Sequence, residues 1–220
     1  MEKRRITFGD YDTAANGGWT LREWALEAAT RKENWVDVPG GHGQRDLSTV
    51  LTDGEPTYNT RTLTATLESS EGTRLNRKAV IDTMVNWLDG WTMDIYLPDE
   101  PLRYIRGVVH VEPLYNDPAH ASVAVSAVCE PWRYNVQETV VSLTAAAEAQ
   151  TAELVNSGRL SVVPLLEITG GSVNLQFGGS SWTLSPGQYK LPDLRLTQGS
   201  HILTYSGAGT VRLTYREAVL

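Results

Sequence analysis

Residues 61–69 read Arg-Thr-Leu-Thr-Ala-Thr-Leu-Glu-Ser, so that Leu63, Ala65 and Leu67 alternate with threonines. A period of two that is rich in β-branched side chains predicts a strand with one buried face. The same alternation recurs over residues 91–97, 102–111 and 121–129. These four segments predict a sheet as the framework of the first part of the chain.

A helix is predicted between the first two of these strands. Residues 74–89 place five apolar side chains at helical spacing: Val80, Ile81, Met84, Trp87 and Leu88. Gly90 follows and can adopt the left-handed conformation that ends a helix. Further along, Asn116-Asp117-Pro118 predicts the turn between the third and fourth strands.

Two segments carry both a helix pattern and a strand pattern. Residues 20–30 open with the capping-box form Thr-Leu-Arg-Glu, yet Trp24, Leu26 and Ala28 alternate as they would in a strand. Residues 145–155 have high helix propensity, although the preceding residues 139–144 are rich in β-branched side chains. Local pattern leaves both segments open.

The final part of the chain consists of short β-rich runs separated by glycines. The runs are 161–169, 172–177, 181–184, 189–196, 201–205 and 210–215. This even spacing predicts an all-β sandwich of about eight strands. Composition changes here too, because residues 1–135 hold six of the seven tryptophans. We therefore predict two domains, residues 1–135 and 136–220.

Composition and charge exclude several functional classes. The 220 residues are 41% hydrophobic and 20% charged, which is typical of a soluble globular protein. No run approaches the ~20 apolar residues that cross a bilayer, so we expect no membrane insertion. A net charge of −7 argues against specific nucleic-acid binding, which needs cations on phosphates. Cys129 is the single cysteine, which fits folding inside a cell.

No catalytic, metal or cofactor site is predicted. The glycines of residues 40–43 lack the Gly-Lys-Ser/Thr of a phosphate-binding loop, and Cys129 alternates with apolar residues as a buried thiol does. The four histidines form no His-x-x-x-His pair, and acidic residues gather only beside turns. The most ligand-like group is His110 and His120 with Glu112 and Asp117, for which surface positions are the simpler interpretation. We expect a protein that is not an enzyme.

Sugar binding through the second domain is an alternative that the residues leave open. A glycan or partner surface there would use an aromatic platform with polar side chains around it. The candidates are Trp182, Arg195, His201 and Arg212. Trp182 also alternates within a predicted strand, so packing in the core competes with this interpretation.

Six short phrases occur in order along nearly the whole chain. They are Ile6-Thr7-Phe8-Gly9-Asp10, Val36-Asp37-Val38-Pro39-Gly40, Tyr58-Asn59-Thr60-Arg61, Leu88-Asp89-Gly90, Cys129-Glu130-Pro131-Trp132-Arg133-Tyr134, and Gly207-Ala208-Gly209-Thr210. In this order the chain resembles the distal tail protein family (Dit) of long, non-contractile-tailed bacteriophages. The resemblance implies a mainly β protein: an N-terminal tail-tube-like β-barrel or sandwich domain with one helix, and a C-terminal galectin-like β-sandwich. It favours strands for both open segments.

The same resemblance implies a structural role in the virion. It implies a homo-hexameric ring at the tail tip, assembled in the host bacterial cytoplasm, through which DNA passes without specific binding. Its implied partners are the tail-tube protein, a tail-tip or tail-associated protein, and receptor-binding or baseplate proteins. Six copies at −7 would give a formal charge of −42, which suits a wall that repels phosphates.

Residues 36–58 are predicted to form an interface arm. They contain many Gly, Asp and Pro residues and few apolar ones, too few for a packed element of their own. The resemblance makes the glycines of residues 40–43 part of a long hairpin arm. We expect this arm to reach onto the adjacent protomer, with a mobile surface loop as the alternative. The candidate contact residues are Val38, Pro39, Gly40, Leu47, Val50, Leu51, Tyr58 and Arg61.

Overall fold

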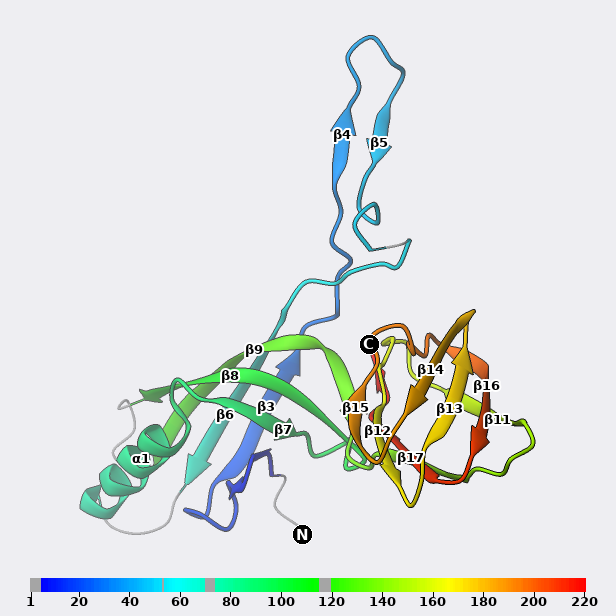
Figure 1. Cartoon of the computed structure of the whole chain (residues 1–220). Helices are drawn as coiled ribbons and strands as arrows, with labels where there is room; N and C mark the ends of the chain where they lie inside the picture. Colours follow the sequence, from blue (N-terminus) through cyan, green and yellow to red (C-terminus); the bar gives the residue numbers. More distant parts are fainter. Residues whose placement is uncertain (1–4, 53, 70–73, 115–119) are drawn as a thin grey trace. The chain divides into compact units, whose positions relative to one another are not determined.

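The computed structural model describes residues 5–52, 54–69, 74–114 and 120–220 (Figure 1). The predicted turn at residues 116–118 lies outside the described residues. The chain divides into two compact units, Met1–Arg133 and Tyr134–Leu220. The sequence had placed this division after residue 135. As predicted, the fold is mainly β, and the described residues contain one helix.

Unit 1 is built on one curled antiparallel sheet. Its strands are β1 (Thr7–Phe8), β2 (Tyr11–Asp12), β3 (Thr20–Leu26), β6 (Arg61–Ser69), β7 (Thr92–Tyr96), β8 (Arg103–Leu114) and β9 (Ala121–Asn135), in the order β2-β1-β7-β8-β9-β6-β3. The strand predicted from the alternation over residues 61–69 is confirmed, because Leu63, Ala65 and Leu67 of β6 are buried while Thr64 is exposed.

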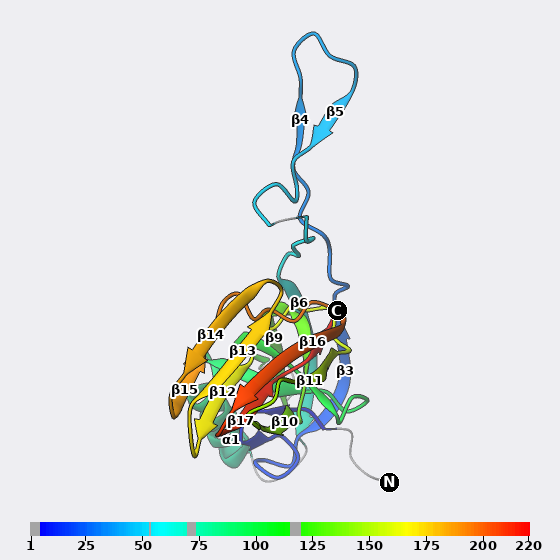
Figure 2. The same ribbon diagram turned by 45° about the vertical axis from the view of Figure 1, so that its right-hand side comes forward.

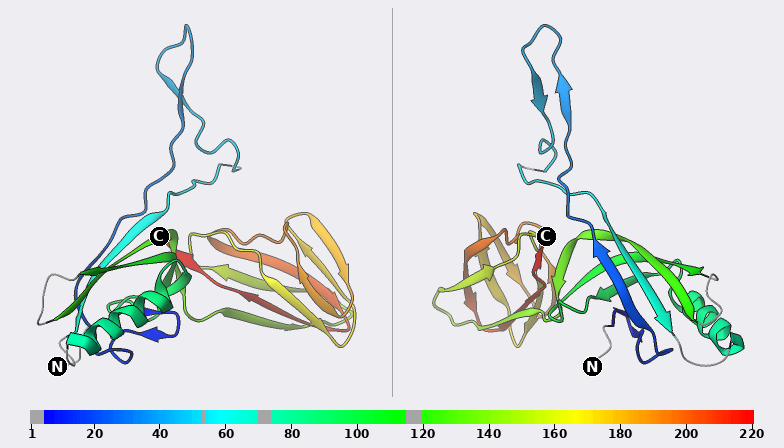
Figure 3. Two further views of the ribbon diagram at one scale, coloured as in Figure 1. Left: turned by 90° about the vertical axis from the view of Figure 1, so that its left-hand side faces the viewer. Right: turned by 180° about the vertical axis from the view of Figure 1, so that it is seen from behind.

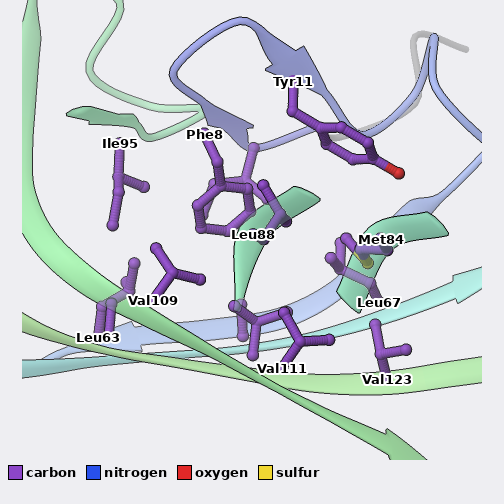
Figure 4. Packing of buried hydrophobic residues seen from close by; sticks show 14 of the residues in the cluster. Phe8, Tyr11, Leu63, Leu67, Met84, Leu88, Ile95, Val109, Val111 and Val123 are labelled. Atoms are coloured by element: carbon purple, nitrogen blue, oxygen red, sulfur yellow. The ribbon is translucent and has the colours of Figure 1, made fainter. Parts of the chain in front are cut away.

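The helix α1 (Arg74–Leu88) lies against the sheet beside β8 (Figure 3). Its Met84 and Leu88 are fully buried in a core that also contains Phe8 and Leu67 (Figure 4). Gly90 ends the helix as predicted: its φ of 79° is left-handed, and its N–H donates a hydrogen bond to the Val109 carbonyl over 2.8 Å. The predicted helix is therefore confirmed.

Each open segment contains a strand and no helix, as the resemblance implied. Residues 20–26 form β3, which pairs with β6 through a bulge between Leu21 and Glu23. Residues 150–156 form β11 and pair with residues 199–205. The ladder hydrogen bonds and the burial of Leu21 and Leu154 outweigh the local helix propensity of each segment.

Unit 2 has two sheets of four strands each. One has the order β10-β17-β12-β15 and the other β11-β16-β13-β14. The strands are β10 (Thr139–Thr144), β11 (Gln150–Asn156), β12 (Leu165–Thr169), β13 (Val173–Phe177), β14 (Ser180–Leu184), β15 (Gly187–Lys190), β16 (Gly199–Gly207) and β17 (Thr210–Tyr215), followed by the short β18 (Ala218–Val219). Leu154, Leu175 and Leu203 from one sheet and Leu166 and Leu213 from the other share one buried core. The predicted sandwich is confirmed.

Two predicted strands of unit 2 are shorter than expected. The strand predicted over 161–169 begins only at Leu165, and the strand predicted over 189–196 ends at Lys190. Pro164 and Pro192 occupy the missing stretches, and proline has no N–H to donate to a sheet ladder. A single isolated bridge, Val162 to Leu196, joins these two stretches.

Candidate functional site

The segment of residues 31–58, here called the arm, forms a sheet of its own with two strands. They are β4 (Trp35–Asp37) and β5 (Gln44–Asp46), which pair with each other (Figure 2). Every residue from 31 to 46 is exposed to solvent. Two isolated strands are at best marginally stable in water, so an ordered hairpin of this kind suggests a binding partner.

Local polar contacts hold the arm in a defined register. The Leu47 N–H donates to the Asn34 carbonyl over 2.8 Å, and Arg31 pairs with Asp46 over 3.3 Å. Hydrogen bonds from the side chain and backbone N–H of Ser48 lower the pKa of Asp46, and Arg31 adds a smaller contribution. The carboxylate therefore remains charged and keeps these contacts in mildly acidic solution.

Large apolar side chains on the arm face solvent. Trp35 is 50% exposed, Val50 65% and Leu51 97%, and Val36 and Val38 are exposed as well. Several large apolar side chains exposed on one short segment are more typical of a site of association than of a free surface. The arm is thus a candidate contact with another protein chain.

The predicted interface residues fall into two groups. Val38, Pro39 and Gly40 lie at the far turn of the hairpin, Val50 and Leu51 lie on its returning segment, and Leu47 is half-buried beside them. Tyr58 lies at the base, where its ring meets the edge of Trp132 at 5.5 Å. The first group can be reached by a partner, whereas Tyr58 ties the arm to β9.

Arg61 belongs to the interior of unit 1 rather than to the exposed arm. It begins β6 opposite Cys129 and is 5% exposed, and its Nε and Nη2 atoms have no hydrogen-bond partner among the described residues. Burial lowers the pKa of its guanidinium, and the charge of Arg133 lowers it further. Arg133 pairs with Glu100 over 2.7 Å. No local sequence pattern links Glu100 and Arg133 to Arg61, so this charged group could not be predicted from the sequence.

A hollow of about 510 Å³ lies along the solvent face of β3, β6, β8 and β9. Short side chains line it, among them Thr64, Thr66 and Ser126, together with the carboxylates of Glu23 and Glu112. His110 also lines it, while the described lining residues include no lysine or arginine. The hollow is therefore acidic, and its lining residues are mostly short, with Trp24 as the exception.

The predicted ligand-like group is not assembled as a metal site. No set of three His, Cys, Asp or Glu residues within the described ranges could hold a metal ion. Asp117 lies outside those ranges, and His110 faces Asp89 at 3.7 Å. Burial raises the pKa of the Cys129 thiol to about 11, so it stays protonated at neutral pH and is a poor nucleophile. No helix in the described part of the chain is long and apolar enough to cross a membrane.

The four candidate glycan residues do not form one cluster. Trp182 packs against the core of unit 2 and pairs in register with Leu175. His201 lies on β16 and hydrogen-bonds the Thr197 carbonyl over 2.8 Å. Arg212 is exposed on the other sheet, between Ser142 and Glu167, and Arg195 follows the end of β15. The structure therefore agrees with the competing interpretation, in which Trp182 packs against the core.

Comparison with known proteins finds similarity of fold rather than of sequence. No family model and no curated protein matches the sequence. The crystal structure of SPP1 Dit, described as a paradigm of the hub adsorption apparatus in phages that infect Gram-positive bacteria, is similar over 98% of this chain and 99% of that chain. The TM-score is 0.71 at 13% sequence identity. The two chains therefore share a fold, and the fold that the sequence resemblance implied is confirmed.

Proposed function

We propose that this protein is a structural hub of a phage tail tip. The observation that carries the proposal is the similarity of fold to SPP1 Dit along the whole chain, both units included. In this role the protein joins the tail tube to the tail-tip, receptor-binding or baseplate proteins. Its place is the virion tail tip, after assembly in the host cytoplasm.

The proposed assembly is a ring of six copies. A closed ring needs a heterologous interface, in which one surface of each copy meets a different surface of the next. The arm supplies one such surface, because no strand of the described residues pairs with its outer edges, and Val50 and Leu51 are exposed. The complementary surface belongs to unit 1 of the adjacent copy.

The acidic hollow is the proposed wall of the channel through which DNA passes. Glu23 and Glu112 repel phosphates, and the short side chains of Thr64, Thr66 and Ser126 offer little to adhere to. Six copies bring a formal charge of −42 to the ring. The wall therefore permits passage of DNA without specific binding.

Mass measurement with and without the arm tests this proposal. Size-exclusion chromatography with light scattering should give six times 24.2 kDa for the concentrated protein. Removal of residues 40–53 should leave a folded monomer, as judged by an unchanged circular dichroism spectrum of the two units. A ring that forms equally well without these residues contradicts the role of the arm.

A further inference from the structure

Unit 1 has a second cavity, which lies beside helix α1. The acidic hollow, by contrast, lies on the solvent face of the sheet. The volume of the second cavity is about 450 Å³, within the ~300–1,000 Å³ that small-molecule sites usually span. The turn between β1 and β2, the loop that follows β2, and helix α1 line it. The lining residues are Asp10, Tyr11, Ala15, Asn16, Gly17, Val80, Thr83 and Trp87.

The cavity is held in shape by the loop that closes it. The Tyr11 hydroxyl donates to the Asn16 carbonyl over 2.8 Å, and the Asn16 N–H donates to the Asp12 carbonyl over 2.8 Å. Gly17 has a φ of 138°, and a Cβ there would lie 2.7 Å from both Trp19 and Val80. The loop can approach α1 this closely only because residue 17 is glycine.

One aromatic face of the cavity is open to solvent. Trp87 is 61% exposed, although Ile81, Met84 and Leu88 of the same helix are buried. Its ring lies 6.5 Å from that of Tyr11, at an angle of 42°. Tyr11 is only 5% exposed, so its ring packs beside Trp87 but offers almost no surface to a ligand.

Polar groups surround this aromatic face. The Asp10 carboxylate and the Asn16 carboxamide make no side-chain hydrogen bond within the described part of the chain. The Thr83 hydroxyl donates to the Ala79 carbonyl over 2.7 Å, which leaves its oxygen lone pairs available. The rim therefore offers acceptors at Asp10 and Thr83 and both a donor and an acceptor at Asn16.

We propose that this cavity binds a neutral saccharide. The C–H face of a pyranose ring would rest on the indole of Trp87, where a large rigid ring gives contact area at low entropic cost. Its hydroxyl groups would hydrogen-bond Asp10, Asn16 and Thr83. This site is separate from the sandwich residues considered for glycans in the sequence, and it does not depend on the proposed ring.

The lining residues discriminate against two other ligand classes. A quaternary ammonium ion needs several open aromatic faces and no hydrogen bonds, whereas here Tyr11 is covered and the rim is polar. A sulfated, phosphorylated or sialylated sugar would meet Asp10, and no lysine or arginine is among the described lining residues. A neutral sugar fits both the aromatic face and the rim.

Titration calorimetry with the full chain tests the proposal. The probes are the neutral sugars lactose, maltose and diacetylchitobiose, with sialyllactose and choline as the other ligand classes. At least one neutral sugar should bind saturably, and Trp87→Ala should weaken that binding by about tenfold or more. Asp10→Ala should weaken it too.

Trp91→Ala is the matched control, because Trp91 is 63% exposed on the same unit and does not line the cavity. This variant should bind the sugar as the parent protein does. The proposal is overturned if none of the neutral sugars binds at millimolar concentration, if Trp87→Ala and Trp91→Ala behave alike, or if choline or sialyllactose binds at this cavity instead.

Discussion

At the scale of single residues, Asn156 shows how one buried amide fixes a loop. It is fully buried at the end of β11, and its Nδ2 donates to the carbonyls of Leu160 and Leu196 over 2.9 and 3.0 Å. Its Oδ1 accepts from the Gly158 N–H over 3.0 Å. These hydrogen bonds anchor the two stretches of unit 2 that contain Pro164 and Pro192 and that lie outside the sheets.

Replacement of this amide should therefore destabilise unit 2. Asn156→Ala leaves buried backbone groups unpaired, which costs about 1–3 kcal/mol. Urea unfolding followed by circular dichroism measures the change. Asn174→Ala is the control, because Asn174 is exposed on β13 and its removal should cost less than about 0.5 kcal/mol. Equal losses in the two variants would contradict the anchoring role.

The buried thiol of Cys129 predicts a second residue-level result. Its pKa is raised to about 11 by burial, against an ordinary value of 9.0. The folded state therefore holds the thiol proton more tightly than the unfolded state does. The protonated thiol's contribution to the free energy of unfolding is fully present below pH 9 and is lost as the pH rises toward 11. At pH 8 a disulfide reagent should label Cys129 only after denaturant is added, and rapid labelling of the native protein would refute its burial.

At the scale of elements, most strands of unit 1 and its helix could be predicted from the alternation and the helical spacing of apolar residues. β6 and α1 could be predicted because each buries one face against a core, which leaves a period of two or of 3.6 in the sequence. The open segments at β3 and β11 could not be resolved locally, since their ladder partners are distant in sequence. The cavity beside Trp87 was missed for the same reason: its residues come from a turn and a helix about 70 positions apart.

The arm illustrates an element whose stability depends on what it contacts. In the described part of the chain β4 and β5 pair only with each other, so the arm should open readily in the free monomer. Trypsin should cleave first after Arg45 of β5 in the monomer, and this site should become protected once the ring forms. Lys190 is the internal control, since it is exposed but belongs to β15, which pairs with β12. Cleavage at both sites at equal rates would show that the arm opens no more readily than the sandwich does.

At the scale of the whole molecule, the account predicts that the acidic hollow becomes enclosed. Thr64→Cys places a thiol on this solvent face of β6. A small maleimide should label it in monomer and ring alike, whereas a large polyethylene-glycol maleimide should label it only in the monomer. Glu153→Cys, on an exposed position of β11, should react with both reagents in both states. Labelling of Thr64→Cys by the large reagent in the ring would place the hollow outside the channel.

Electron microscopy of the concentrated protein in negative stain would show directly whether the chain assembles into a ring. We expect closed particles with six-fold symmetry around an open centre, each containing six chains of 24.2 kDa. Images that contain only single copies or open chains at every concentration, or rings of a different number, would contradict the proposed ring of six.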